Sequence, residues 1–69
     1  MKVLRKRQRL ILEVIKQRGG TATARELAAC TKRSIDGVTQ SLAALDIHGY
    51  VQYLGGVGGD QSWRLVRSA

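Results

Sequence analysis

The stretch TARELAACTKRSIDGVTQSLAALDIHGYV, residues 23–51, decides the fold because it holds two helix-start signals, each followed by apolar residues at helical spacing. Its first four residues, Thr23 to Glu26, match a capping box, in which the threonine hydroxyl accepts a backbone N–H and the glutamate reaches back to the cap. Ser34 is a second residue of the type that begins helices. The stretch therefore predicts two helices separated by a short polar break.

The apolar residues of this stretch define the two helices. The first is expected from Ala24 to about Ala29, and the polar break Cys30–Arg33 follows it, with Cys30 expected to be buried as a small hydrophobe. The second is expected over residues 35–48 and ends at Gly49. Its apolar positions are spaced by three, four and three residues, which predicts one core-facing stripe: Ile35, Val38, Leu42 and Leu45.

The segment before this stretch predicts another helix over residues 2–18. Leu4, Ile11 and Ile15 fall along one face, and the glycines that follow Arg18 are typical of a helix end. Residues 21–23 are partly β-branched, which favours a short strand between this helix and the next.

The segment after the stretch predicts a β-hairpin. Residues 50–54 and 62–66 are rich in β-forming residues, and a loop with four glycines joins them. Trp63 and Leu65 would share one strand face, with Trp63 packed in the core, and Arg64 would point the other way. The tip at 55–60 carries no cation, and we expect it to be mobile. It matches neither phosphate-loop pattern and leads into a strand instead of a helix.

Charge is the most unusual property of the composition. The 69 residues include 12 Lys and Arg against 5 Asp and Glu, a formal net charge of +7 with a pI near 10.6. This length allows one domain, residues 1–69. A small basic domain of this kind most often binds a polyanion, with nucleic acid as the first candidate, and the alternative is that the charge serves solubility alone.

Several other classes are disfavoured by the sequence. A single cysteine makes neither an intramolecular disulfide nor a zinc site of paired cysteines, and it fits a reducing, cytoplasmic setting. No apolar run approaches the length of a membrane span or of a secretory signal. The acids are scattered and form no catalytic constellation. We therefore expect no enzyme activity, no cofactor, no metal, no membrane partner and no evident small-molecule effector.

Taken together, these residues resemble the winged helix-turn-helix DNA-binding domains of small bacterial, plasmid or phage transcriptional regulators. The resemblance runs from about Leu4 to Val66 and lies in core and turn positions: Leu27–Ala28, Val38, Leu42, Leu45, Gly49, Val51 and the closing SWRL. It implies an α+β fold of three helices, with a helix-turn-helix at 24–48 and a two-stranded wing at 50–66. The sequence departs from the family at Thr31–Lys32–Arg33, where a glycine is usual, and at Gly37, inside a helix.

The resemblance also implies which residues meet DNA. In this fold the helix at 35–48 would lie in the major groove, and the wing at 54–64 would lie on the backbone or the minor groove of double-stranded DNA. The implied contacts are Arg33, Ser34, Asp36, Gly37, Thr39, Gln40 and Ser41, with Gln61 and Arg64 from the wing. Gln40 can pair with adenine and Arg33 with guanine. The alternative for the helix is a solvated polar face.

A second group of residues is expected on the phosphate backbone: Arg5, Lys6, Arg7, Arg9, Arg25 and Lys32. If these cations neutralise phosphates, the affinity for DNA would fall steeply as the salt concentration rises. A competing role for the cluster at 5–9 is an arm that pairs with another subunit, and a homodimer is the expected assembly of such regulators. Two alternatives stay open for the whole chain. One is a protein-interaction adaptor without DNA binding, and the other is RNA binding, which the scarcity of aromatic residues disfavours.

Overall fold

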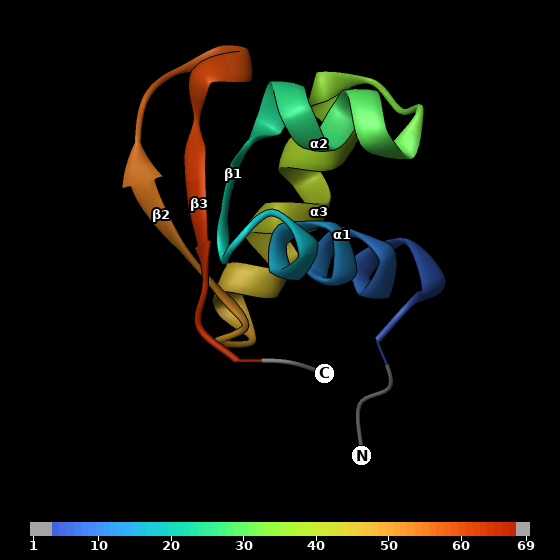
Figure 1. Cartoon of the computed structure of the whole chain (residues 1–69), viewed down its shortest axis with the longest axis vertical. Coiled ribbons are helices and arrows are strands. Elements are labelled where there is room, and N and C mark those ends of the chain that lie inside the picture. The colour runs from blue at the N-terminus through green and yellow to red at the C-terminus, as the bar shows by residue number, and fades with distance from the viewer. Residues whose placement is uncertain (1–3, 68–69) are drawn as a thin grey trace.

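Three helices and a three-stranded antiparallel sheet make up the computed structural model, which describes residues 4–67 (Figure 1). The elements in chain order are α1 (Lys6–Gln17), β1 (Thr21–Thr23), α2 (Ala24–Thr31), α3 (Ile35–Ile47), β2 (Val51–Gly55), the 3-10 turn η1 (Gly58–Asp60) and β3 (Ser62–Leu65). The expected α+β class, the short strand and the C-terminal hairpin are confirmed.

The sheet has the order β1-β3-β2, so its last strand in sequence lies in its centre. Both pairings are antiparallel: Trp63 lies opposite Ala22 on one side and Tyr53 on the other. The β2–β3 register shifts between Tyr53 and Gly55, where β2 has one extra residue. The sheet stands on one side of the helices, at the left of Figure 1.

The core lies between the three helices and the inner face of the sheet, as the apolar spacing predicts. Fully or almost fully buried side chains come from every helix and strand: Ile11 and Ile15, Ala22, Leu27, Val38, Leu42 and Leu45, Val51 and Trp63. Trp63 is 5% exposed, and its ring centroid lies 5.2 Å from that of Tyr53. Leu4 and Ile35 pack against this cluster from its edge.

Both helix-start signals of the opening stretch are confirmed. The Thr23 hydroxyl accepts a hydrogen bond from the Glu26 N–H at 3.1 Å, and Glu26 Oε1 accepts one from the Thr23 N–H at 2.9 Å. Ser34 Oγ accepts from the Gly37 N–H at 3.1 Å. These side chains satisfy backbone donors that have no partner inside the helix, and they fix where α2 and α3 begin.

The first helix is shorter than the expected span of 2–18. Leu4 and Arg5 precede it, and residues 2 and 3 lie outside the described part of the chain. Arg5 has the extended backbone of an N-cap, with φ −69° and ψ 156°, and its N–H donates to Gln8 Oε1 at 2.9 Å. Gln8 therefore caps the helix from within its first turn, so that the regular helix begins at Lys6.

The second helix is longer than expected, because it includes Cys30 and Thr31 from the predicted break. The Thr31 hydroxyl donates to the Leu27 carbonyl at 2.7 Å, and the chain reverses only at Lys32, which has a left-handed backbone with φ 56°. Cys30 is exposed on this added turn, so the expectation that it is buried is wrong. The left-handed backbone at Lys32 costs about 1 kcal/mol or more for a residue with a side chain.

The glycine-rich tip forms a turn that folds back onto the helices. The mobility expected of this tip in the free protein stays a prediction. Residues 58–60 form η1, which contacts α2, and Gly59 is buried. A Cβ placed on Gly59 would lie 3.0 Å from both Arg25 Nη2 and Ile35 Cδ1. Glycine therefore permits the tip to approach the start of α2 and the start of α3.

Candidate functional site

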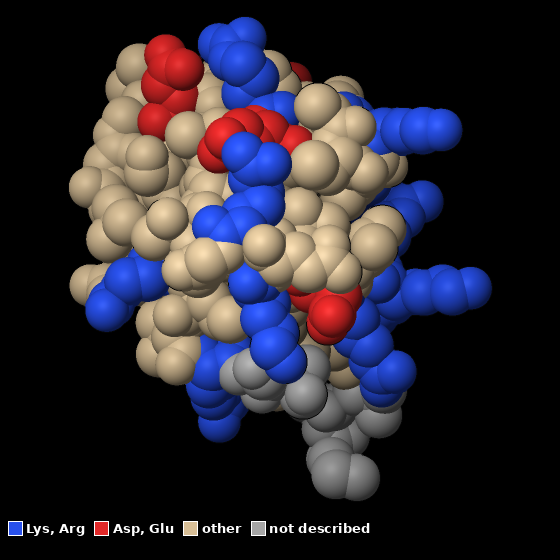
Figure 2. Space-filling view, viewed as in Figure 1, with Lys and Arg blue, Asp and Glu red and all other residues tan. Residues whose placement is uncertain are grey.

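The N-terminal half of α1 carries a dense group of cations. Lys6, Arg7 and Arg9 are exposed on this half, and Arg5 is exposed just before it. Figure 2 shows Lys and Arg side chains projecting at the right, where the start of α1 and the turn between α2 and α3 lie in Figure 1. The cations expected to cluster at residues 5–9 are therefore all exposed to solvent. Lys16 is a further exposed cation, in the last turn of the helix.

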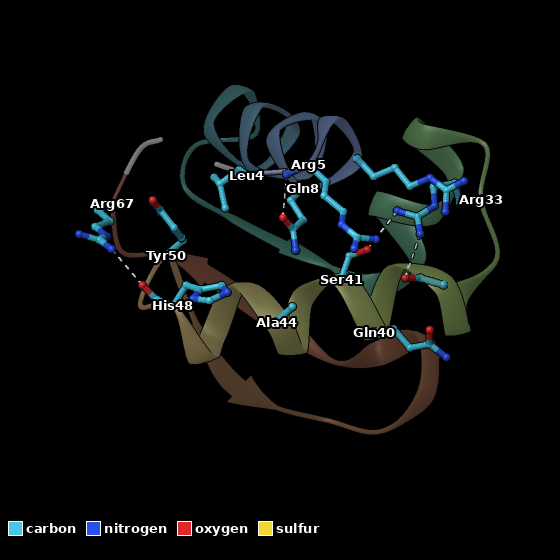
Figure 3. A pocket seen from close by; sticks show the side chains of 12 residues that line it. Leu4, Arg5, Gln8, Arg33, Gln40, Ser41, Ala44, His48, Tyr50 and Arg67 are labelled. Carbon is cyan, nitrogen blue, oxygen red and sulfur yellow. Dashed lines mark hydrogen bonds between the residues drawn. The ribbon is translucent and has the colours of Figure 1, made fainter. Parts of the chain in front are cut away.

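A groove of about 800 Å³ runs between this end of α1 and one flank of α3. Figure 3 shows Tyr50 and Arg67 at one end of the groove, and Arg33 and Gln40 at the other. Its lining residues come from α1, α3 and the segments next to them: Leu4, Arg5, Arg7, Gln8, Arg33, Gly37, Gln40, Ser41, Ala44, His48, Tyr50 and Arg67. We call this set the α1–α3 groove.

Arg33 is held against the flank of α3 by its own hydrogen bonds. After the chain reverses at Lys32, the Arg33 N–H donates to the Ala28 carbonyl at 3.0 Å. Its guanidinium donates to the Gly37 carbonyl at 3.1 Å and to Ser41 Oγ at 3.3 Å. A Cβ on Gly37 would lie 3.3 Å from Arg33 Nη2, so the glycine inside α3 provides room for this side chain.

Arg67 closes the other end of the groove. Its guanidinium carbon lies 4.4 Å from the centroid of the Tyr50 ring, and it donates to the His48 carbonyl at 3.0 Å. The backbone positions it, because the N–H of Val66 donates to the Tyr50 carbonyl at 2.8 Å. The return strand therefore brings a C-terminal arginine to the C-terminal end of α3.

Only some of the α3 residues expected to contact DNA line the groove. Gly37, Gln40 and Ser41 line the α1–α3 groove, whereas Asp36 is exposed outside it. Thr39 is half-buried, and its hydroxyl donates to the Ile35 carbonyl at 2.7 Å. Only Gln40 belongs both to the groove and to the exposed surface of the helix.

The electrostatics of α3 differ from those of α1. The sequence of α3, IDGVTQSLAALDI, contains two aspartates and neither lysine nor arginine. The cations near it come from Arg33, just before the helix, from Arg5 and Arg7 across the groove, and from Arg67 at its C-terminal end. The cationic side chains that would attract an anion to α3 therefore all lie outside the helix itself.

The two hairpin residues that were expected to contact DNA do not line the α1–α3 groove. Arg64 is exposed on β3 and donates to the side chain of Gln52 on the neighbouring strand. Gln61 lies just before β3, and its carbonyl accepts from the Ala24 N–H at 2.9 Å. Neither side chain lines the groove.

The remaining expected phosphate contacts are spread over the surface. Lys6 and Arg9 are exposed on α1 beside the groove, and Lys32 is exposed at the end of α2. Arg25 Nη2 lies 3.7 Å from Asp60 Oδ1, so this cation faces a carboxylate of the hairpin tip. Arg5 and Arg7 are the two members of the expected phosphate set that line the groove.

Several groove residues were not predicted from the sequence: Leu4, Gln8, Ala44, His48, Tyr50 and Arg67. A usable signal existed for the last two. An antiparallel hairpin that pairs Val51 with Leu65 places the residues after 65 next to those before 51. Register reasoning of this kind would have brought Arg67 to Tyr50.

The Glu26 carboxyl has a pKa below its ordinary value. The backbone hydrogen bond from Thr23 lowers the pKa of this carboxyl below its ordinary value, and nearby Arg18, with which Glu26 forms an ion pair, lowers it further. These are the contacts of a helix cap. No group of three or more potential metal ligands lies within residues 4–67, and none of the helices described is long and apolar enough to cross a membrane.

No protein-family model matches the chain, and neither the curated proteins nor the solved structures give a match. Any function therefore has to be argued from the charge, the groove and the arrangement of the elements.

Proposed function

We propose that this chain is a winged helix-turn-helix domain that binds double-stranded DNA in a sequence-specific manner and regulates transcription. The order of the elements supports this proposal. α2 and α3 are joined by a tight turn, and the β2–β3 hairpin follows α3 as a wing would. We further propose that the protein acts in the cytoplasm, without enzyme activity and without a cofactor.

The observation that carries the proposal is the group of cations beside an uncharged, polar position of α3. Gln40 is exposed between the groove and the outer face of the helix, and Arg5, Arg7 and Arg33 lie along the same flank. A glutamine can form two hydrogen bonds with adenine in the major groove, while arginines neutralise phosphates. In this arrangement Gln40 selects sequence, and the α1 cations supply affinity.

The first experiment is selection of bound sequences from a random duplex pool, followed by fluorescence anisotropy of the selected duplex at rising salt. With Z neutralised phosphates, the logarithm of the association constant falls with the logarithm of salt concentration at a slope of about −0.9Z. Absence of binding to any duplex at low salt would overturn the proposal.

Two variants separate the roles of the residues. Gln40→Ala is expected to reduce discrimination between bases at one position by about 1–3 kcal/mol, because the paired hydrogen bonds are lost. Lys6→Gln is expected to weaken binding to all duplexes by a similar factor. It is also expected to make the salt dependence of binding shallower by about the contribution of one phosphate. If Gln40→Ala instead weakens binding to every duplex by the same factor, Gln40 does not select the sequence.

A second candidate function, protein interaction without DNA binding, is favoured by exposed apolar side chains. Ile47 at the end of α3 is 83% exposed, and Leu54 and Val57 on the hairpin are 50% and 81% exposed. Contiguous exposed apolar surface marks protein-interaction sites, and these side chains are among those that a partner would bury. Recovery of one partner after nuclease treatment, lost in the Ile47→Ser variant and insensitive to salt, would support the adaptor over the regulator.

A further inference from the structure

The α1–α3 groove is positively charged along its whole length. Its described lining includes Arg5, Arg7, Arg33 and Arg67, and none of these lining residues is an aspartate or glutamate. The two ion pairs formed within residues 4–67 join Arg18 to Glu26 and Arg25 to Asp60, and neither involves a groove residue. The four guanidinium charges are therefore not balanced by a described carboxylate.

The start of α1 adds to this positive potential. A helix N-terminus carries a partial positive charge, and acidic residues usually compensate it. The first turn of α1 contains no acid, and Lys6 and Arg7 occupy it. Cations at this end of a helix are unfavourable in the free protein, and a bound anion would relieve the repulsion.

The arginines come from separate parts of the chain and are oriented by neutral partners. Arg33 uses two of its donors on the Gly37 carbonyl and Ser41 Oγ, and Arg67 uses one on the His48 carbonyl while lying over Tyr50. A guanidinium has five N–H donors, so each retains donors for a ligand. Arginine is well suited to phosphate because its planar fork matches two phosphate oxygens.

We propose that the α1–α3 groove is a binding site for a ligand with two or more phosphate groups, held between Arg5, Arg7, Arg33 and Arg67. Its volume of about 800 Å³ lies within the range of small-ligand sites. Cations at both ends favour linked phosphates over a single one (Figure 3). Successive phosphates of a DNA strand and a free oligophosphate or nucleotide share this chemistry. The site does not depend on the proposed function, because the lining alone defines it.

The test is a titration of the full chain with sodium tripolyphosphate at constant ionic strength, followed by amide chemical shifts and calorimetry. Binding is expected to shift the resonances of Arg7, Ser41 and His48. Arg7→Gln and Arg67→Gln are each expected to weaken binding about tenfold, the effect of losing one hydrogen bond to a charged group. Arg67→Gln lies outside the regular elements, so it keeps the measurement interpretable if an α1 variant perturbs the helix.

Lys16→Gln is the matched control. It removes the same charge from an exposed position of the same helix, in its last turn, and Lys16 does not line the groove. A specific site predicts at most about a twofold effect for this variant, since only long-range attraction is lost. Equal weakening by Lys16→Gln and Arg7→Gln, or no binding of tripolyphosphate at all, would overturn the proposal.

Competition with a labelled duplex distinguishes the two sources of phosphate. If tripolyphosphate displaces the duplex and Arg67→Gln weakens both ligands equally, the DNA backbone occupies the groove. If the duplex stays bound while tripolyphosphate fills the groove, the ligand is a separate small molecule. If tripolyphosphate binds and no duplex does, the proposed function fails while the phosphate site holds.

Discussion

Lys32 shows how a single backbone conformation positions the groove. Its left-handed φ of 56° ends α2 and turns the chain so that Arg33 reaches the flank of α3. A left-handed lysine gives no distinct sequence signal, because any residue with a side chain is disfavoured there. The placement of Arg33 was therefore not predictable, although its identity as a candidate ligand was.

Two substitutions at Ser34 distinguish an effect on the stability of the fold from an effect on duplex binding. Ser34→Ala removes the cap on the Gly37 N–H and is expected to destabilise the fold by about 1 kcal/mol. Ser34→Asp keeps a cap of equal quality and is expected to leave the fold as stable, while its carboxylate weakens duplex binding. Urea denaturation and duplex titration of both variants check this pair of outcomes. An aspartate variant that binds as tightly as the parent would remove Ser34 from the interface.

Glu26 makes part of the stability depend on pH. Because folding lowers the pKa of this carboxyl, its contribution is fully present above the ordinary value of 4.5 and is lost as the pH falls through the lower folded value. Melting temperatures of the parent and of Glu26→Gln are expected to differ at pH 7 and to converge once the pH has fallen below the lowered folded-state pKa. Glu13→Gln, at an exposed position of α1, is the charge-matched control. A constant difference from pH 7 to pH 3 would contradict this role.

At the scale of elements, the sequence predicted what apolar spacing and caps determine. The stripe of α3 at Val38, Leu42 and Leu45 and both cap residues were located correctly, because burial and local hydrogen bonds depend on spacing along the chain. Element ends were less predictable, because side-chain bonds such as those of Gln8 and Thr31 moved them by a few residues. The groove was not foreseen as a unit, since it needs the register that brings Arg67 to Tyr50.

The hairpin tip tolerates glycine replacement at one position and not at another. A Cβ on Gly56, at φ +97°, would lie 2.3 Å from the Asp60 carbonyl oxygen, whereas one on Gly58, at φ +57°, would meet nothing within 4 Å. Gly56→Ala is therefore expected to destabilise the fold by about 2 kcal/mol or more, and Gly58→Ala by about 1 kcal/mol. Urea denaturation measures both. Equal effects would mean that η1 does not hold the tip in its observed turn.

The dimensions of the whole molecule limit how much DNA one copy can cover. The longest axis of the described residues is 32 Å, which corresponds to about nine base pairs at 3.4 Å each. If the proposed function holds, affinity is expected to stop rising at duplexes of about 10 base pairs for a monomer. A dimer on two half-sites would extend the rise to about 20 base pairs. Anisotropy with duplexes of graded length distinguishes these outcomes, and sedimentation of the complex checks the stoichiometry. An affinity that keeps rising with every added turn would indicate nonspecific binding along the lattice.

The central position of β3 also determines when the domain can complete its structure. β1 pairs only with β3, about forty residues further along the chain. During synthesis, the helices are therefore made while β1 and β2 have no common neighbour, and Ala22 and Val51 have no Trp63 to cover them. Because this loop is long, pairing of β1 with β3 is expected to be slower than formation of the local β2–β3 hairpin. A nascent chain that stalls before residue 62 would expose the apolar side of its helices and become a target for chaperones and proteases.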